Sequence, residues 1–497
     1  MDKIYIPNRF KGRIGYHIFV DRYCRAGPEP PTMEGRRLKP WTDSVPDWWP
    51  DQDGEYRNEY FYGGNLQGII QNLEYITKLS ADLLYLSPIS KTHTNHHYDV
   101  EDQRVIDPYI GTWDDFTSLC IKAHERNMLV AVDLVFNHMG AKSEFFQKAL
   151  QGDERYRNWF EWDERGNPVY WYGFKDMPQT NKLNPDYQEY ACEVVEKYVT
   201  AGADCIRLDL GEILPKEFVQ KIKQRARSIN PEVLIVSEMW DFALFRSNPQ
   251  IYDGQVDSVM NYPLSDAIIR WVRYGNHLHF SACMKNLAKY PKEVHDVLWN
   301  HLDTHDTPRA LNMLAGNGMT ENPFSGRIWD IEGPWRRNDG FDTYNFRKWE
   351  AENDFCLTDE AIKKLELAAT AQFLMKGIPI IFSGTEVGVC GNKDPFNRKP
   401  YPWENENLWI RQFYAVLGNM RRSNRDILAD GDIYTYADDR VLEIVRRSKA
   451  GIIVAFLNRT NSRHQLDLNY PNSKTIFSLN GSTDKILQPY GAVVCRF

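Results

Sequence analysis

The chain of 497 residues is 42% hydrophobic and carries a formal net charge of −8 at pH 7, which suits a large globular core with smaller domains attached. The acidic balance excludes a nucleic-acid-binding protein, which needs clustered Lys and Arg to displace counterions from phosphates. No apolar run approaches the ~20 residues that span a bilayer, and the N-terminal segment lacks an apolar core followed by a small-residue cleavage site. We therefore expect a cytoplasmic protein without a nucleic-acid or membrane partner.

Short apolar or β-branched runs alternate with longer segments of helical period over most of the chain. Eight such runs predict strands, at 13–20, 81–88, 128–136, 204–209, 232–238, 255–262, 296–306 and 378–384. Strand–helix alternation repeated eight times is the pattern of a (β/α)8 TIM barrel, in which right-handed crossovers keep the strands parallel. The sequence therefore predicts an α/β protein with such a barrel.

The spacing between the runs predicts the domain organisation. More residues separate the third and fourth strands than one helix needs, and the surplus at 140–185 is aromatic and polar. We interpret it as a small inserted domain that divides the barrel into residues 1–139 and 186–423. The segment 310–357 is a second long excursion, which we interpret as a lid-like loop because loops of this length are usually functional or disordered. Beyond residue 424 short alternating runs predict an antiparallel β-sandwich at 424–497.

Aromatic residues are concentrated in loop-like segments that are rich in Gly and Pro. Many of the 15 Trp and 27 Tyr lie at 41–50, 158–174 and 333–349. Half or more of them are expected to pack their own loops against the barrel. The remainder favours a carbohydrate ligand, because sugar rings present apolar C–H faces to aromatic rings.

Ionisable residues follow four of the predicted barrel strands. An Arg-x-Asp pair in isolation is more often a structural ion pair than a catalytic one. Here, however, charged side chains recur at the ends of strands that should be continuously apolar, and the C-terminal ends of barrel strands meet at one mouth. The sequence therefore predicts an active site there, made of Asp133, Asn137, His138, Arg207, Asp209, Glu238, His305 and Asp306.

Three carboxyl groups and one guanidinium at a barrel mouth indicate cleavage of a glycosidic bond. In a retaining mechanism one carboxylate is the nucleophile and a second carboxyl is the acid/base. Arg207 favours the ionised form of Asp209, as a nucleophile needs. The apolar run before Glu238 favours its protonated form, as a general acid needs. Asp306 is left to interact with the sugar as positive charge develops, while the nearby histidines donate to hydroxyls.

The same stretches resemble the four signature regions of the α-amylase family, glycoside hydrolase family 13: DLVFNH, IRLDLGEI, SEMWD and LDTHDTPR. Flanking blocks such as YHIFVDRY, NHHYDVEDQRVIDPYIGTWDDF and GIPIIFSGTEVGVCGNKDPFNRKPYPW agree with it, and the resemblance covers nearly the whole chain. It implies a barrel, an inserted domain and a C-terminal sandwich. It also implies that Asp209 is the nucleophile, Glu238 the acid/base and Asp306 the transition-state stabiliser. The substrate-binding residues that it implies are Tyr98 as stacking platform, His138, Arg207, His305 and Arg309.

Within the family, the chain is similar to cyclomaltodextrinases, neopullulanases and maltogenic amylases. Trp240 and the segment MPQTNKLN carry this similarity, and Trp240 is expected on the acceptor side of the substrate. The resemblance implies cleavage of α-1,4 links, and of α-1,6 links as a further target, in maltooligosaccharides, cyclodextrins, pullulan or starch. We expect the loop 310–357 to restrict access by long glucans. A homo-oligomer is left open.

The chain also departs from that group at several places. Asp241 stands where the group usually has His, and LGEI replaces the usual VANE after the nucleophile. The first predicted strand begins near Arg13, so the group's extra N-terminal domain, and closure of the site by it in a dimer, are not expected. We expect subsite specificity to differ accordingly.

We expect no cofactor and do not favour bound calcium. Many α-amylases bind calcium with the Asn of the third-strand block and a His four residues after the nucleophile. This chain has Asn137 but carries Ile213 at the second position, which suggests a structural hydrogen-bonding role for Asn137. The eight cysteines are dispersed without a C-x-x-C pair, and His93, His96 and His97 belong to the block that supplies Tyr98, so no metal site is predicted. Two interpretations of Asp99 stay open: contact with the substrate end, or shaping of its loop.

Two rival functions are considered. A carbohydrate-binding protein built on an inactive amylase barrel requires the loss of Asp209, Glu238 or Asp306, and all three are present. A transglycosylase or a disaccharide isomerase keeps the same site, because a sugar hydroxyl can intercept the covalent intermediate in place of water. The sequence alone does not separate the second rival from a hydrolase.

Overall fold

A parallel eight-stranded barrel forms the centre of the computed structural model. The structure describes residues 5–43, 58–315, 357–392, 394–466 and 473–497, together with the backbone of four two-residue strands at 320–321, 331–332, 336–337 and 340–341. The barrel strands are β1 (Gly15–Ile18), β4 (Leu83–Leu86), β7 (Leu129–Leu134), β8 (Cys205–Leu208), β9 (Leu234–Ser237), β10 (Ser258–Val259), β11 (Trp299–His301) and β16 (Ile378–Phe382). All eight predicted strands are confirmed.

The strand order is β10-β9-β8-β7-β4-β1-β16-β11, and every neighbouring pair is parallel. The two outermost strands meet at one isolated parallel bridge, Met260 to Trp299. This bridge closes the ring, which confirms the predicted barrel. Strands such as β4 and β9 are buried along their whole length, as expected when helices cover the outside and side chains fill the inside.

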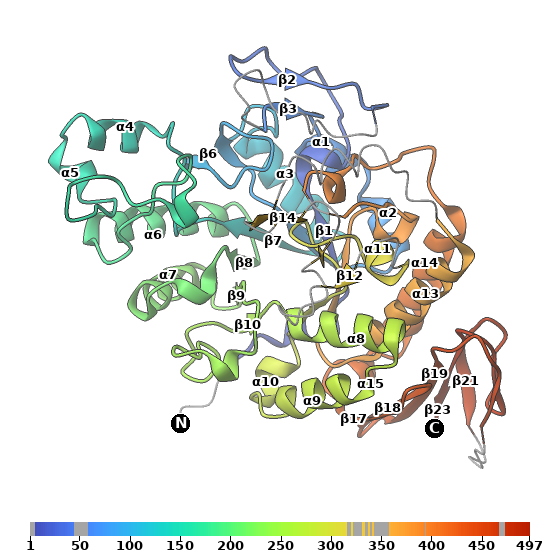
Figure 1. Ribbon diagram of the computed structural model, residues 1–497. Helices are drawn as coiled ribbons and strands as arrows, with labels where there is room; N and C mark the ends of the chain where they lie inside the picture. The colour runs from blue at the N-terminus through green and yellow to red at the C-terminus, as the bar shows by residue number, and fades with distance from the viewer. Residues whose placement is uncertain are drawn as a thin grey trace.

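Amphipathic helices surround the strands (Figure 1). Helix α6, for example, begins with Asn184 as an N-cap that accepts two backbone N–H groups, and Pro185 occupies its first turn, a typical helix start. The helices of the barrel and its C-terminal extension are α1 (Leu66–Gln71), α2 (Leu73–Lys78), α3 (Trp113–His124), α6 (Pro185–Thr200), α7 (Lys216–Ile229), α8 (Tyr262–Tyr274), α9 (His277–Leu287), α10 (Lys292–His295), α11 (Ala310–Ala315), α13 (Asp359–Leu374), α14 (Leu408–Ser423) and α15 (Arg425–Leu428). None of the helices in the described ranges combines the length and apolar character needed to cross a membrane.

The long connections after the strands build the barrel mouth. The hairpin β5 (Ser90–Thr92) with β6 (Val100–Ile106) carries Tyr98 and Asp99, and β2 (Arg37–Leu38) pairs with β3 (Tyr60–Phe61). The stretch 140–185, expected as an inserted domain, holds α4 (Glu144–Leu150) and α5 (Glu154–Arg157) and continues in irregular bridged backbone. Figure 1 shows α4 and α5 on the side of the barrel opposite the C-terminal sheet.

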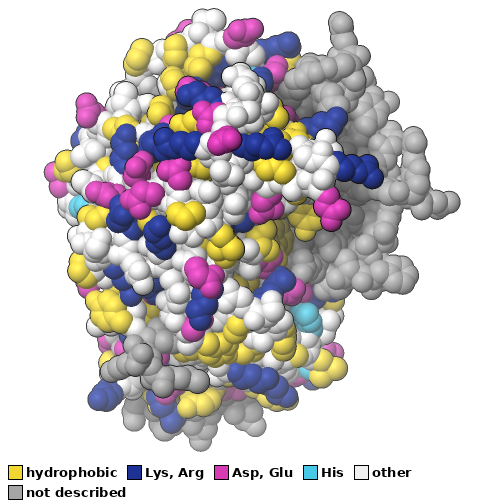
Figure 2. All heavy atoms as spheres, turned by 90° about the vertical axis from the view of Figure 1, so that its left-hand side faces the viewer, with side chains coloured by type: hydrophobic (Ala, Val, Ile, Leu, Met, Phe, Trp, Pro, Cys, Tyr) yellow, Lys and Arg dark blue, Asp and Glu magenta, His cyan; other side chains and the backbone are white. Residues whose placement is uncertain are grey.

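Both charge signs are interspersed on the face that Figure 2 presents. This face is the left-hand side of Figure 1, where α4 and α5 lie. Among the described residues in this view, Lys and Arg lie next to Asp and Glu, and neither sign gathers into a continuous patch.

The C-terminal part is an antiparallel five-stranded sheet in the order β17-β18-β19-β23-β21, as expected. Its strands are β17 (Asp432–Ala437), β18 (Val441–Ser448), β19 (Gly451–Asn458), β21 (Lys474–Leu479) and β23 (Ala492–Arg496), with a separate ribbon of β20 (His464–Gln465) and β22 (Ile486–Leu487). Residues such as Ile444 and Leu457 join the main core with the barrel. On the opposite face, Val454, Phe456 and Leu487 form a smaller apolar cluster.

Two fully buried arginines attach this sheet to the barrel. Arg421 donates to the backbone carbonyls of Phe373 and Gly377, and Arg446 donates to that of Leu374 at 2.9 Å. Burial lowers the pKa of Arg421 to about 9 and that of Arg446 to about 10. The guanidinium groups thus bind carbonyls at the end of α13 that lack a helical partner.

The predicted lid-like loop 310–357 is described only in part. Helix α11 begins it, and two short antiparallel pairs follow, β12 (Thr320–Glu321) with β13 (Ile331–Glu332) and β14 (Arg336–Arg337) with β15 (Gly340–Phe341). The interpretation of this loop as a lid concerns residues that lie largely outside the described ranges. The aromatic-rich segments at 41–50 and 333–349 lie largely outside them too.

Candidate active site

One guanidinium connects three carboxylates at adjacent strand ends. Arg207 of β8 is completely buried, and its Nη1 lies 2.7 Å from Asp133 Oδ1 of β7 and 2.9 Å from Asp209 Oδ1. Its Nη2 lies 3.0 Å from Glu238 Oε2, at the end of β9. Alternation along a strand puts Arg207 and Asp209 on the same face, so the charged pair in this strand points into the barrel mouth.

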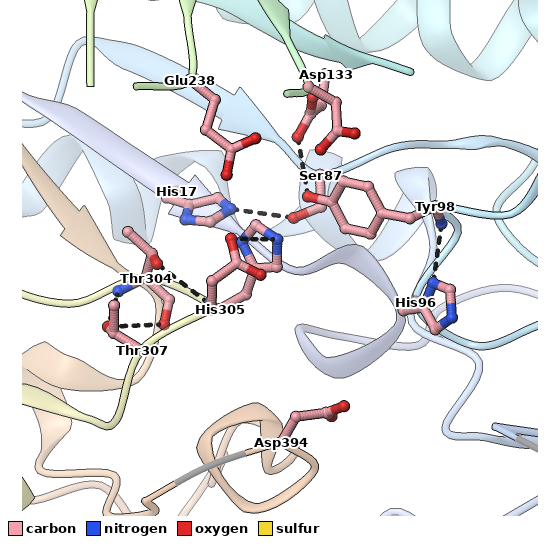
Figure 3. Close-up of polar contacts among 12 residues, drawn as sticks. His17, Ser87, His96, Tyr98, Asp133, Glu238, Thr304, His305, Thr307 and Asp394 are labelled. Atoms are coloured by element: carbon pink, nitrogen blue, oxygen red, sulfur yellow. Dashed lines mark hydrogen bonds and ion pairs between the residues drawn. The ribbon is translucent and has the colours of Figure 1, made fainter. Parts of the chain in front are cut away.

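Asp133 binds the hydroxyl groups of two tyrosines in the site. Its Oδ2 accepts hydrogen bonds from the hydroxyls of Tyr85 at 2.8 Å and Tyr98 at 2.9 Å. The Tyr98 ring is stacked on His305, with centroids 5.1 Å apart and an interplanar angle of 6°. Figure 3 shows Tyr98 and His305 lying near one another, with Glu238 and Asp133 pointing toward them from the strand ends.

His305 and Asp306 bring the end of the seventh barrel strand into the site. Nε2 of His305 lies 3.1 Å from Oδ2 of Asp306. Arg398 donates from Nε to the His305 carbonyl at 2.9 Å, and its Nη2 lies 3.5 Å from Asp306 Oδ1. Arg398 also pairs with Asp394 at 3.2 Å, which Figure 3 shows on the other side of the site from Glu238.

Sequence reasoning missed Arg398 and Asp394 as site residues. Both lie in the segment GNKDPFNRKP, which follows the eighth barrel strand and which had served only as a flanking block of the resemblance. The sequence did contain a signal for them. Charged residues follow the eighth strand on the mouth side of the barrel, as they follow the third, fourth, fifth and seventh strands.

Burial controls protonation of the carboxyl groups. Burial and the neighbouring Glu238 raise the pKa of Asp306 to about 7. Burial and Glu238 also raise the pKa of Asp209 well above its ordinary value, although Arg207 acts in the opposite direction. Arg207 thus acts on Asp209 in the direction that the sequence analysis expected, and burial together with Glu238 acts against it.

The histidines of the site are neutral at pH 7. Burial lowers the pKa of His138 to about 4 and lowers that of His305 well below its ordinary value. Since the neutral rings add no positive charge, Arg207 and Arg398 are the cations that face Asp133, Asp209, Glu238 and Asp306. With its pKa raised to about 7, the Asp306 carboxyl is partly protonated near neutral pH.

His138 and Trp240 each contact other residues of the site. Nε2 of His138 lies 3.1 Å from the Tyr98 carbonyl, and its ring is stacked on Trp171 of the inserted stretch at 5.5 Å and 19°. The indole N–H of Trp240 donates to Glu238 Oε1 at 2.9 Å. The site thus brings together Tyr98, His138, Arg207, Asp209, Glu238, Trp240, His305 and Asp306.

Asp99 and Arg309 have structural partners instead. The Asp99 carboxylate is buried and accepts hydrogen bonds from the hydroxyls of Thr92 and Thr94, which favours the interpretation that it shapes its loop. Arg309 is 2% exposed, lies over the Phe382 ring and donates to the carbonyls of Asn397 at 2.7 Å and Ser383 at 2.9 Å. These partners commit the guanidinium to the backbone beneath the mouth, and the substrate contact expected for Arg309 stays a prediction.

The described residues contain no group of three or more His, Cys, Asp or Glu side chains arranged to hold a metal ion. Oδ1 of Asn137 accepts a hydrogen bond from Lys182 Nζ at 3.2 Å, and Lys182 lies 3.2 Å from Glu161 Oε1. The lysine is 8% exposed. Its ammonium group is thus the cation that Asn137 and Glu161 bind.

Comparison with known proteins agrees with this geometry. The family model for the catalytic domain of alpha-amylase matches residues 7–325. A cyclomaltodextrinase from Thermoanaerobacter pseudethanolicus is 28% identical over 95% of this chain and 74% of its own length. An intracellular maltogenic amylase from Bacillus subtilis is 27% identical over 100% of this chain and 76% of its own length. Among solved structures, a debranching enzyme from Nostoc punctiforme is similar with a TM-score of 0.76 and 25% identity over 100% of both chains.

Proposed function

The chain belongs to the alpha-amylase family and is a glycosidase of that type, and we propose that it is a retaining α-glucan hydrolase. It cleaves α-1,4 bonds, and α-1,6 bonds as a further target, through a covalent glycosyl-enzyme intermediate. The observation that carries this proposal is the arrangement of Asp209 and Glu238 on one guanidinium, Arg207, at distances of 2.9 and 3.0 Å. Two carboxyls held on one cation at a barrel mouth can act as nucleophile and acid/base of one reaction.

In the first step, an oxygen of Asp209 attacks the anomeric carbon while Glu238 donates a proton to the glycosidic oxygen. The bond to the leaving sugar breaks with its electron pair remaining on that oxygen, which takes the proton. In this step Asp209 reacts in its ionised form beside Arg207 Nη1 at 2.9 Å. Asp306 and the neutral His305 next to it at 3.1 Å face the sugar as positive charge develops.

In the second step, Glu238 removes a proton from water, whose oxygen attacks the anomeric carbon and releases Asp209. A sugar hydroxyl in place of water gives transfer instead of hydrolysis. The same site geometry serves both outcomes, so the acceptor decides between them.

The substrate class is supported by the names of the relatives. Cyclomaltodextrinase and maltogenic amylase are names for enzymes of cyclic and linear α-glucans, and the debranching enzyme supports α-1,6 links as a target. We assign this chain maltooligosaccharides and cyclodextrins as substrates, with pullulan and starch as polymeric ones. The word intracellular in the name of one relative supports a cytoplasmic location.

An exposed aromatic tip beside His138 supports a carbohydrate ligand. The tip is the short 3-10 turn η3 (Trp171–Gly173) and the following Phe174; Tyr172 is 85% exposed and Phe174 57% exposed. Tyr172 has φ +46°, a left-handed conformation that is unusual for a non-glycine residue. Since Trp171 stacks on His138, the tip extends the sugar-binding surface outward from the catalytic groups.

The test is a product time course on maltotriose, β-cyclodextrin, pullulan, soluble starch and panose, with Asp209→Asn as the blank. Cleavage of any of these by the wild type, with a silent variant, supports the hydrolase and its nucleophile. Products longer than the substrate would instead show that transfer dominates. Absence of any reaction would refute the α-glucan assignment.

A further inference from the structure

The structure assigns Trp240 as a positioning residue that orients the carboxyl group of Glu238, and assigns Glu212 and Arg246 as the pair that holds Trp240. We propose that this chain of contacts holds the Glu238 carboxyl group in the orientation from which it reaches the glycosidic oxygen of the leaving sugar. The proposal rests on the proposed function, because it takes Glu238 as the acid/base.

Both oxygens of Glu238 have fixed donors. Oε1 accepts the indole N–H of Trp240 at 2.9 Å. Oε2 accepts the backbone N–H of Leu210 at 2.7 Å and lies 3.0 Å from Arg207 Nη2. Because donors approach the two oxygens separately, the carboxyl group is fixed in rotation as well as in position.

The indole of Trp240 is itself held in one plane. Its ring is stacked on Tyr262, with centroids 4.1 Å apart and 13° between the planes. Tyr262 is fully buried and meets His301 edge to face at 4.3 Å. Since the N–H bond lies in the plane of the ring, this stack fixes the direction in which Trp240 donates.

Glu212 holds the backbone of the same residue. The backbone of Trp240 hydrogen-bonds the Glu212 carboxylate, and Oε2 of this carboxylate lies 2.7 Å from Arg246 Nη2. The backbone N–H of Glu212 donates to the Glu238 carbonyl at 3.1 Å. The loops after β8 and β9 are therefore joined at several points around the acid/base.

Two departures from the related group meet in this cluster. Glu212 belongs to the segment LGEI, and Asp241 replaces the usual His. Nη2 of Arg246 lies 3.6 Å from Asp241 Oδ2 and also binds Glu212. One guanidinium thus contacts both unusual residues, so we interpret them as parts of a single arrangement.

The backbone of Leu210 shows that the arrangement is built at a conformational cost. Leu210 has φ +47° and ψ 32°, in the left-handed region that residues with a Cβ rarely adopt. This conformation directs its N–H to Glu238. Such conformations persist where the surrounding structure determines them, and they cluster at functional sites.

The chemical consequence follows from the two oxygens. Oε2 accepts the Leu210 N–H and lies beside Arg207, so Oε1 is the oxygen left to carry the proton toward the glycosidic oxygen. The indole N–H holds Oε1 in one orientation. Loss of this N–H lets the carboxyl group rotate away from the glycosidic oxygen, while the nucleophile keeps its contact with Arg207.

The experiment compares Trp240→Phe, which keeps a ring for the Tyr262 stack but has no N–H, with wild type. Its readouts are kcat and KM on maltotriose and on 4-nitrophenyl α-maltoside, whose leaving group needs little protonation. We expect kcat on maltotriose to fall about tenfold with KM little changed, as general acid catalysis contributes about 10²–10⁴-fold in all. The nitrophenyl substrate should lose less than about threefold, because its departure depends little on a correctly oriented acid.

Glu212 supplies a second pair of variants. Glu212→Gln keeps an acceptor for the Trp240 backbone, so its kinetics should stay close to those of wild type. Glu212→Ala removes this acceptor and should resemble Trp240→Phe, with a larger loss of kcat on maltotriose than on the nitrophenyl substrate. The control is Trp409→Phe, remote from the site, which also removes an indole-to-carboxylate hydrogen bond, from Trp409 to Glu366 at 2.8 Å. It should match wild type in every kinetic readout.

Two results would overturn the inference and leave the proposed function standing. One is a rise in KM of Trp240→Phe with kcat unchanged, which would make Trp240 only a sugar contact. The other is an equal loss on both substrates, which would indicate general distortion of the site. A wild type that cleaves no α-glucan would instead refute the proposed function.

Discussion

Nζ of Lys182 lies 3.2 Å from Oδ1 of Asn137, so an ammonium group occupies the position next to the amide that serves calcium in many α-amylases. A divalent cation at this oxygen would lie against the lysine charge in a mostly buried site, where repulsion is strong. Ile213, 51% exposed, adds no ligand. These residues do not fit a calcium ion.

The first prediction is that the protein does not need calcium. Dialysis against EDTA should leave both kcat on maltotriose and the thermal midpoint unchanged. Differential scanning fluorimetry with and without added calcium measures this directly. Loss of activity on dialysis that calcium alone restores would contradict the assignment of Lys182.

The second prediction concerns the nucleophile. Asp209→Asn should reduce kcat by about 10⁴-fold, because an amide cannot form the glycosyl ester while the fold is retained. Mass spectrometry of the wild type after reaction with an activated fluoroglycoside should show the added sugar on the peptide that contains Asp209. Label on another carboxyl would move the nucleophile to that residue.

The third prediction concerns pH and stability. Burial raises the pKa of Asp306 to about 7 in the folded protein, so the folded state binds a proton that the unfolded state releases near pH 4. Stability from this group is complete below the unfolded pKa and is lost as pH rises through about 7. The thermal midpoint of Asp306→Asn minus that of wild type should therefore be larger at pH 8 than at pH 5. Thermal midpoints across this range test it, and an equal difference at both values would argue against a raised pKa.

The fourth prediction concerns the exposed aromatic tip. Replacing both Tyr172 and Phe174 by Ala should raise KM for maltoheptaose several-fold, because stacking on sugar faces is lost, with about 1 kcal/mol expected per exposed aromatic contact. kcat should change little. Tyr436→Ala, at a 67% exposed position on β17, is the matched control and should behave as wild type. An unchanged KM in the double variant would remove the tip from the sugar-binding surface.

The fifth prediction distinguishes two roles of Arg309: stabilising the fold and binding the substrate. Arg309→Met leaves the carbonyls of Asn397 and Ser383 without their buried donor, which should cost about 3 kcal/mol of unfolding free energy. KM of the folded variant should remain that of wild type. Urea denaturation and steady-state kinetics measure the two quantities. A large rise in KM without loss of stability would support the role first expected for this residue.

The barrel and most residues of the candidate site follow from local sequence patterns. Buried parallel strands are recognisable as apolar runs, and a charged residue directly after such a run lies at the mouth of the barrel. Arg207, Asp209 and Glu238 were predicted in this way, and the structure places all three in one ion-pair cluster. The strand register of the inserted stretch and of the C-terminal sheet depends on contacts between distant segments. Only the general position of these two parts of the chain was predictable.

The features that the sequence did not predict depend on contacts between residues far apart in the chain. The direction of Arg309 is determined by carbonyls from the loop after β16, and no periodic pattern indicates them. The pairing of Arg246 with Glu212 joins two loops. The raised pKa of Asp209 arises from burial and from the neighbouring Glu238, and both depend on neighbours in space and not along the chain.

The two buried guanidinium groups at the end of α13 also determine when the protein can finish folding during its synthesis. The carbonyls of Phe373, Leu374 and Gly377 receive their donors from Arg421 and Arg446, which leave the ribosome later than the barrel strands. Buried carbonyls without donors are costly, so the helix that precedes the eighth strand stays incompletely satisfied until β18 has emerged. The barrel therefore acquires all the donors for these carbonyls only after β18, in the sheet that follows it, has been made.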